Sequence, residues 1–88
     1  MNKYELEERT LKFSIKLIET LKKLPKNLFN HKLISQCISS GTSIGANYYE
    51  ANGAESRKDF KHKIRISFKE SRETKYWLNI LKTTNTRK

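Results

Sequence analysis

The sequence predicts an all-α protein, an antiparallel up-and-down helical bundle, with three helices at about residues 5–24, 30–52 and 56–83. Three observations predict this fold. Apolar residues recur at intervals of three and four along the chain, which is the period of an amphipathic helix. No segment shows the strict alternation of a half-buried strand. Turn signals at Pro25 and at Asn52-Gly53 divide the chain into three segments.

The first predicted helix carries one apolar stripe with charged residues between its members. The stripe consists of Leu6, Phe13, Leu17, Leu21 and Leu24, and Leu11, Ile15 and Ile18 lie beside it. Because proline disfavours helical backbone in the residue before it, we expect this helix to end before Pro25.

The second predicted helix starts near Asn30, which is a suitable N-cap residue, and ends at Gly53. Its stripe has spacings of four, three, four and three, and consists of Ile34, Ile38, Gly41, Gly45 and Tyr48. The stripe therefore runs through the unusual glycine- and serine-rich segment from Ser39 to Asn47.

That segment raises the question of a phosphate-binding loop. A P-loop requires G-x-x-x-x-G-K-[ST] after a strand, whereas Gly41 and Gly45 are three residues apart, no lysine follows and no strand precedes. Glycine inside a helix costs about 1 kcal/mol relative to alanine, so two glycines need a reason. We interpret Cys37, Gly41 and Gly45 as a helix-packing seam, where small residues let another helix approach closely.

Two further interpretations of the glycines stay open. Large side chains, for which Phe60, Phe68 and Tyr48 are the candidates, could occupy the space beside them. Alternatively, the glycines could simply bend the helix.

The third predicted helix opens with Ser56-Arg57-Lys58-Asp59, which has the form of a capping box with aspartate in place of glutamate. One face holds the core stripe Phe60, Ile64, Ser67, Ser71, Thr74, Leu78 and Leu81. The polar tail 83–88 is expected to fray.

The chain is strongly basic, with a formal net charge of +10 in 88 residues. Residues 54–88 hold eleven basic and four acidic residues, whereas residues 27–53 hold one of each. Such a balance favours nucleic acid, an anionic membrane or an acidic protein as the partner. Four glutamates on the first helix offset its basic residues, which argues against a membrane surface.

A helical wheel places the cations of the third helix on one face. We define the basic ridge as Lys58, Lys61, Arg65, Lys69, Arg72 and, at its edge, Lys75. Such a run is often only a solvated helix face, but few acidic residues compensate this one. The ridge is therefore the candidate nucleic-acid-binding site, for RNA or DNA.

Another stripe of the third helix consists of Ile66, Glu70, Glu73 and Trp77, at spacings of four, three and four. An apolar pair on a second face predicts an oligomer interface, in which the glutamates pair with arginines of another subunit. The alternative is that Trp77 belongs to a wide core stripe.

Nothing in the sequence predicts catalysis, a metal site, a cofactor or a small-molecule substrate. The two histidines lack partners at zinc-ligand spacing, and the single cysteine has no nearby base. No signal peptide or membrane-spanning apolar run is present, which predicts a cytoplasmic protein.

Three stretches resemble one known family. They are ERTLKFSIKLIETLKKLP, SGTSIGANYYEANGAES and RKDFKHKIRISFKESRETKYWLNIL, and the resemblance covers about residues 6–82. The sequence is similar to the four helix bundle protein family, also called the 23S rRNA intervening sequence protein family. The accessory proteins of diversity-generating retroelements are similar as well.

The resemblance implies an antiparallel bundle that assembles into a homo-oligomer, a ring-like pentamer. It also implies a basic, non-enzymatic protein, since the family has no recognised catalytic site. Family members usually continue with a turn and a fourth helix, so residues 1–88 form a single domain that is C-terminally short relative to the family. A truncated gene and a helix supplied by a neighbouring chain both stay open as explanations.

Two functions follow as hypotheses. The first is an oligomeric accessory factor that binds nucleic acid through phosphate contacts of the basic ridge. The alternative is a structural or protein–protein interaction module, or a truncated remnant, with no nucleic-acid role.

Overall fold

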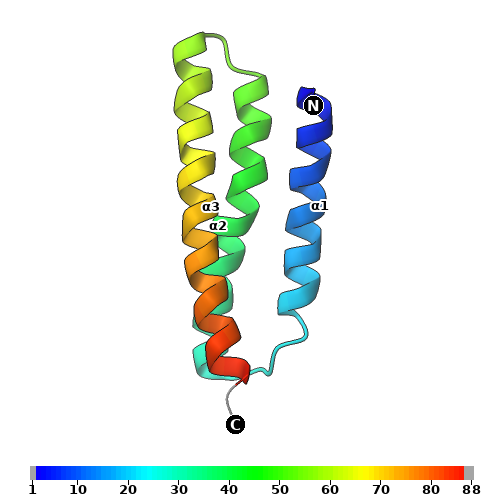
Figure 1. Ribbon diagram of the computed structural model, residues 1–88, viewed down its shortest axis with the longest axis vertical. Coiled ribbons are helices and arrows are strands. Elements are labelled where there is room, and N and C mark those ends of the chain that lie inside the picture. The colour runs from blue at the N-terminus through cyan, green and yellow to red at the C-terminus, as the bar shows by residue number, and fades with distance from the viewer. Residues whose placement is uncertain (1, 87–88) are drawn as a thin grey trace.

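Three helices make up the fold, as the sequence predicts. The computed structural model describes residues 2–86, and its elements are α1 (Lys3–Leu21), α2 (Leu28–Asn52) and α3 (Arg57–Thr86), with no strand among these residues. The helices run antiparallel in an elongated bundle of 50 × 20 × 18 Å, with α2 packed against both α1 and α3 (Figure 1). The predicted all-α bundle is therefore confirmed.

The α1 helix begins at a cap and ends earlier than predicted. The side chain of Asn2 accepts hydrogen bonds from the amides of Tyr4 and Glu5, both at 3.0 Å. The helix ends at Leu21, because the chain tightens there into a turn in which the amide of Leu24 donates to the carbonyl of Leu21 at 3.2 Å. Leu24 lies outside the helix but still packs against the core.

The α2 helix starts at a different asparagine from the predicted one. Asn27 is the N-cap, since its backbone is extended and its side chain accepts from the amide of Asn30 at 2.9 Å. Asn30 is instead buried. Its Nδ2 donates to the carbonyl of Pro25 at 2.8 Å, and its amide group exchanges two hydrogen bonds with Asn85 of α3, at 2.8 and 3.0 Å.

The α3 helix starts at the predicted cap, where the amide of Asp59 donates to Oγ of Ser56 at 3.0 Å. It continues to Thr86, so the prediction that residues 83–86 fray is wrong. The reciprocal pair of Asn85 with the buried Asn30 holds this last turn against α2. The rest of the predicted frayed tail, 87–88, lies outside the described residues.

The core is small and lies toward the end of the bundle that holds the α1–α2 turn. Its buried members come from all three helices and are Leu17, Leu21, Cys37 and Leu81. Partly buried residues pack around them, namely Leu24, Leu33, Ile34, Ile38, Trp77 and Leu78.

Not every member of the predicted apolar stripes is buried. Phe13 of α1 keeps 41% of its surface exposed and Phe60 of α3 keeps 39%. Beside the first stripe, Leu11 and Ile15 keep 58% and 49%. A groove between α1 and α3, floored by Ile44 of α2, leaves Phe13 open to water. Three helices thus leave part of the apolar surface without a partner.

None of the helices within residues 2–86 has the length and apolarity that a bilayer crossing requires.

Candidate nucleic-acid interface and packing seam

All six residues of the basic ridge are exposed. Thr74, at 2% exposure, is among the most buried residues of α3 and marks the side that faces α2. At 100° per residue, Arg65 lies about 180° from Thr74 around the helix. The ridge therefore points away from the rest of the bundle, except at its edge, where Lys75 lies beside the groove between α1 and α3.

The ridge cations form no ion pair with an acidic residue within the described part of the chain. The ion pairs among residues 2–86 join Lys12 to Glu8 at 3.0 Å and Lys63 to Glu50 at 2.8 Å, and neither involves the ridge. Lys63 is also on α3, but unlike the ridge cations it has an acidic partner. Its hydrogen bond to Glu50 and the charge of that carboxylate raise the pKa of Lys63. The ridge residues are left as uncompensated positive charges.

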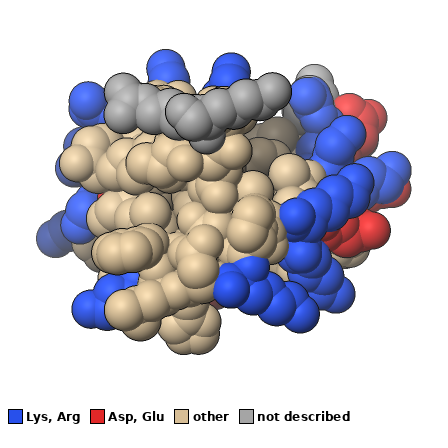
Figure 2. Space-filling view, turned by 90° about the horizontal axis from the view of Figure 1, so that it is seen from below, with Lys and Arg blue, Asp and Glu red and all other residues tan. Residues whose placement is uncertain are grey.

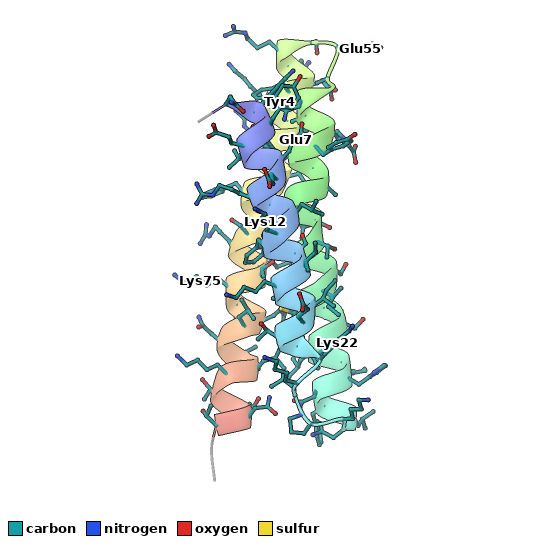
Figure 3. All side chains as sticks on the ribbon, turned by 90° about the vertical axis from the view of Figure 1, so that its right-hand side faces the viewer. Tyr4, Glu7, Lys12, Lys22, Glu55 and Lys75 are labelled. Carbon is teal, nitrogen blue, oxygen red and sulfur yellow. The ribbon has the colours of Figure 1, made fainter. Side chains whose placement is uncertain are left out.

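The ridge is long enough to contact several phosphates. Lys58 and Lys75 are separated by about 25 Å at a rise of 1.5 Å per residue. Lys75, labelled in Figure 3, lies on α3 near the middle of the bundle. Figure 2 shows the end of the bundle that holds the α1–α2 turn, where Lys and Arg side chains lie around most of the rim, with Asp and Glu side chains beside them on the right, and uncharged residues fill the centre. Positive charge thus faces outward on the sides of the bundle.

The glycines of the packing seam lie where α1 crosses α2. A Cβ atom on Gly41 would overlap Cδ2 of Leu17, and one on Gly45 would lie 3.1 Å from Cβ and Oγ1 of Thr10. Cys37, the third seam residue, is completely buried in the core. The space beside the glycines is occupied by α1.

The large side chains considered for that space lie elsewhere. No atom of Phe60, Phe68 or Tyr48 is among the closest neighbours of either glycine. Phe68 keeps 66% of its surface exposed. Leu17 and Thr10 of α1 already fill the position, so this alternative interpretation is wrong.

Small hydroxyl residues hold α3 close to α2. Oγ1 of Thr74 donates to Oγ of Ser40 at 2.9 Å, and Oγ of Ser67 donates to the carbonyl of Ile44 at 2.8 Å. Short side chains let the two backbones approach, and hydrogen bonds satisfy the polar groups that this buries. The spacing of seven between Ser67 and Thr74 was visible in the sequence, but the identity of their partners was not.

The predicted oligomer-interface residues divide into two groups. Glu73 is exposed, whereas Ile66, Glu70 and Trp77 are half-buried. Trp77 packs against the core, as the alternative interpretation has it. Its indole Nε1 is buried without an acceptor among residues 2–86. Tyr76 meets the Trp77 ring edge to face, with 5.2 Å between centroids.

The groups that could support chemistry are scattered. Within residues 2–86, no three His, Cys, Asp or Glu side chains gather in a way that could hold a metal ion. Burial raises the pKa of the Cys37 thiol, which keeps it protonated at neutral pH. A protonated, buried thiol is a poor nucleophile.

Comparisons with known proteins agree with the helical fold and identify the family. No curated protein matches the chain. A solved structure from Bacteroides thetaiotaomicron VPI-5482, a protein of unknown function from the S23 ribosomal protein family, is 36% identical with a TM-score of 0.82. The match covers 100% of this chain and 79% of that one. The model of the 23S rRNA-intervening sequence protein family matches residues 2–88, so the chain belongs to this family.

Proposed function

We propose that the protein is a non-enzymatic accessory factor that binds nucleic acid through phosphate contacts of the basic ridge. The observation that carries the proposal is the ridge itself: six exposed cations on one face of α3, without an ion-pair partner among residues 2–86. Lysine and arginine held this way attract phosphates, because neutralising them releases condensed counterions from the nucleic acid.

The ridge favours contacts with the backbone rather than with bases. Phosphate contacts position a protein on nucleic acid without reading its sequence. We therefore infer little sequence preference and an affinity that falls steeply with salt.

The names of the relatives add support. The family name refers to 23S rRNA, and the Bacteroides protein is assigned to an S23 ribosomal protein family. Both names agree with a role beside nucleic acid.

We further infer a cytoplasmic homo-oligomer, for which the family resemblance implies a pentamer. In an oligomer the ridges of several copies would act together, and linked weak sites bind far more tightly than one alone. The solution mass by light scattering tests the copy number.

A second candidate function is a protein–protein interaction module. The exposed apolar residues Leu11 and Ile15 of α1 favour it, since they lie four residues apart on one face of the helix and keep 58% and 49% of their surface in water. Apolar residues gathered on one surface are typical of contacts with other proteins.

A charge-reversal experiment separates the two functions. The test variant carries Lys61→Glu, Arg65→Glu and Arg72→Glu on the ridge. The control variant carries Lys16→Glu, Lys23→Glu and Lys32→Glu, which are also exposed and change the net charge by the same amount. Binding of labelled RNA and DNA is measured by fluorescence anisotropy, and folding by circular dichroism.

We expect the ridge variant to lose binding while the control variant keeps most of it. Equal losses in both variants would show that net charge alone attracts nucleic acid. Unchanged binding in the ridge variant would overturn the proposal. A wild-type protein that forms a stable oligomer but binds no nucleic acid would favour the interaction module.

A further inference from the structure

Aromatic rings lie exposed among the ridge cations. Phe68 keeps 66% of its surface in water and Tyr76 keeps 58%. Large rings exposed to this extent contribute little to the core. Their position beside the cations suggests a role in binding.

The rings and cations share one line along α3. Lys61, Arg65, Phe68, Arg72 and Tyr76 follow at spacings of four, three, four and four. Residues three and four apart on a helix are direct neighbours, so Phe68 lies between Arg65 and Arg72. We call these five residues the aromatic–basic line.

The ring of Tyr76, the second ring of the line, is supported by a neighbouring ring. Tyr76 packs edge to face on Trp77, with an interplanar angle of 72°. Trp77 in turn packs against the core. The Tyr76 ring is therefore supported by a fixed neighbour while it stays open to solvent.

We propose that the aromatic–basic line binds single-stranded nucleic acid, with bases stacked on Phe68 and Tyr76 and phosphates bound by the cations between them. This inference rests on the proposed function and names its substrate class. Every base has a π-face, so aromatic stacking binds single strands with little regard to sequence. In a duplex these faces are covered by neighbouring base pairs, and the exposed rings would have nothing to stack on.

The spacing of the rings also suits an extended strand. Phe68 and Tyr76 are eight residues apart, which is about 12 Å along the helix. Neighbouring bases in a duplex strand are only about 3.4 Å apart. The two rings would thus take bases that an extended single strand holds apart, with Arg72 between them placed for a phosphate of the backbone that joins those bases.

The test compares ligands that differ in one property at a time. The probes are oligothymidylate, oligouridylate, an abasic strand and a duplex, all of equal length. The abasic strand keeps the phosphates but has no bases. The variants are Phe68→Ala and Tyr76→Ala, and the control is Phe29→Ala, which removes a phenylalanine on α2 that is 77% exposed.

We expect wild-type protein to prefer oligothymidylate or oligouridylate over both the abasic strand and the duplex. Each ring removal should weaken binding of the base-bearing strands about fivefold to a hundredfold, the range for lost base stacking. Binding of the abasic strand should not change, and the Phe29 variant should behave as wild type. The ratio of the two base-bearing affinities decides between DNA and RNA.

Trp77 supplies a second readout, since it is the only tryptophan. A base stacked on Tyr76 changes the surroundings of the adjoining indole. Single-stranded ligand should therefore alter Trp77 emission in wild type but not in Tyr76→Ala, while duplex should leave the emission unchanged.

The failure of this inference is distinguishable from failure of the proposed function. If duplex binds as well as single strands and the ring variants bind normally, while ridge charge reversal abolishes binding, only the stacking proposal is overturned. If no probe binds at all, both fall. If Phe68→Ala lowers the oligomer mass but not the affinity, the ring is a protein contact and the stacking proposal is overturned.

Discussion

Replacing Gly41 by alanine tests the closest approach between α1 and α2. Gly41 is buried, and a methyl group there would overlap Cδ2 of Leu17 and lie 3.5 Å from Cγ2 of Thr74. Leu17 is only 5% exposed and is enclosed by the core. Its side chain therefore has little open space into which it can move.

Two effects of opposite sign determine how much Gly41→Ala changes the unfolding free energy. Alanine in place of glycine stabilises a helix interior by about 1 kcal/mol. Overpacking a filled core typically costs about 1–3 kcal/mol. Because the contact is an overlap with a buried side chain, we expect the packing term to win and Gly41→Ala to lower the unfolding free energy by about 1 kcal/mol.

Thermal and urea unfolding followed by circular dichroism measure the change. A loss of about 1 kcal/mol corresponds to a fall in Tm of about 4–8 °C in a domain of this size. Gly53→Ala is the matched control, because its Cβ would meet only the carbonyl of Glu50, at 3.7 Å. It should change stability far less.

A double-mutant cycle identifies the cause. In Gly41→Ala with Leu17→Ala the overlap is gone, so the double variant should be more stable than the sum of the two single losses, by about 0.5–3 kcal/mol. If Gly41→Ala instead raised stability by the full helix-propensity gain, the packing of α1 on the seam would be refuted.

Three further predictions concern buried groups. Asn85→Ala leaves the buried Asn30 amide short of partners and should cost about 1–3 kcal/mol in urea unfolding, with loss of helix at the end of α3; unchanged stability would contradict the role of the pair. Thr74→Val removes the donor to Ser40 and should cost about 1 kcal/mol at nearly constant volume; a stability gain would show that the hydroxyl is not needed. Cys37 should react slowly with iodoacetamide, in step with unfolding as denaturant rises, because burial raises its pKa. Rapid labelling of the native protein would contradict the burial of Cys37. Because the pKa of the thiol is lower in the unfolded chain, the unfolded thiol ionises first, and the contribution of Cys37 to stability is lost as pH rises into the alkaline range.

Local patterns were sufficient to predict most of the fold. Helical periodicity predicted all three helices, and Ser56 and Gly53 marked two of their ends. These signals act over a few residues, so they can be recognised without knowing the partners. The exposure of the basic ridge follows from the same wheel, since all of its residues except Lys75 lie on the side of α3 opposite the buried Thr74.

Long-range partners could not be predicted from the same patterns. Asn30 looked like a cap because asparagine is a common N-cap, but its partner Asn85 lies 55 residues away. That contact buries Asn30 and keeps the end of α3 helical. Likewise, the glycines indicated a close approach, but only the bundle shows that Leu17 and Thr10 fill it.

The partial burial of some apolar residues could not be predicted from the sequence either. Phe13 and Phe60 have the right spacing for a core stripe, yet both stay partly in water because three helices do not close over them. Phe68 was considered as filling for the seam, and its exposure next to Arg65 and Arg72 became visible only once the helices were placed.

The salt dependence of single-strand binding tests the central claim most directly. If each of the six ridge cations contacts one phosphate, log K should fall with log salt at a slope of about −4, from about −0.7 per phosphate for single strands. The variant with three ridge cations reversed should bind far more weakly with a much shallower slope. The control variant with Lys16, Lys23 and Lys32 reversed should keep a slope near that of wild type. Equal slopes in all three proteins, or no binding at low salt, would contradict the account.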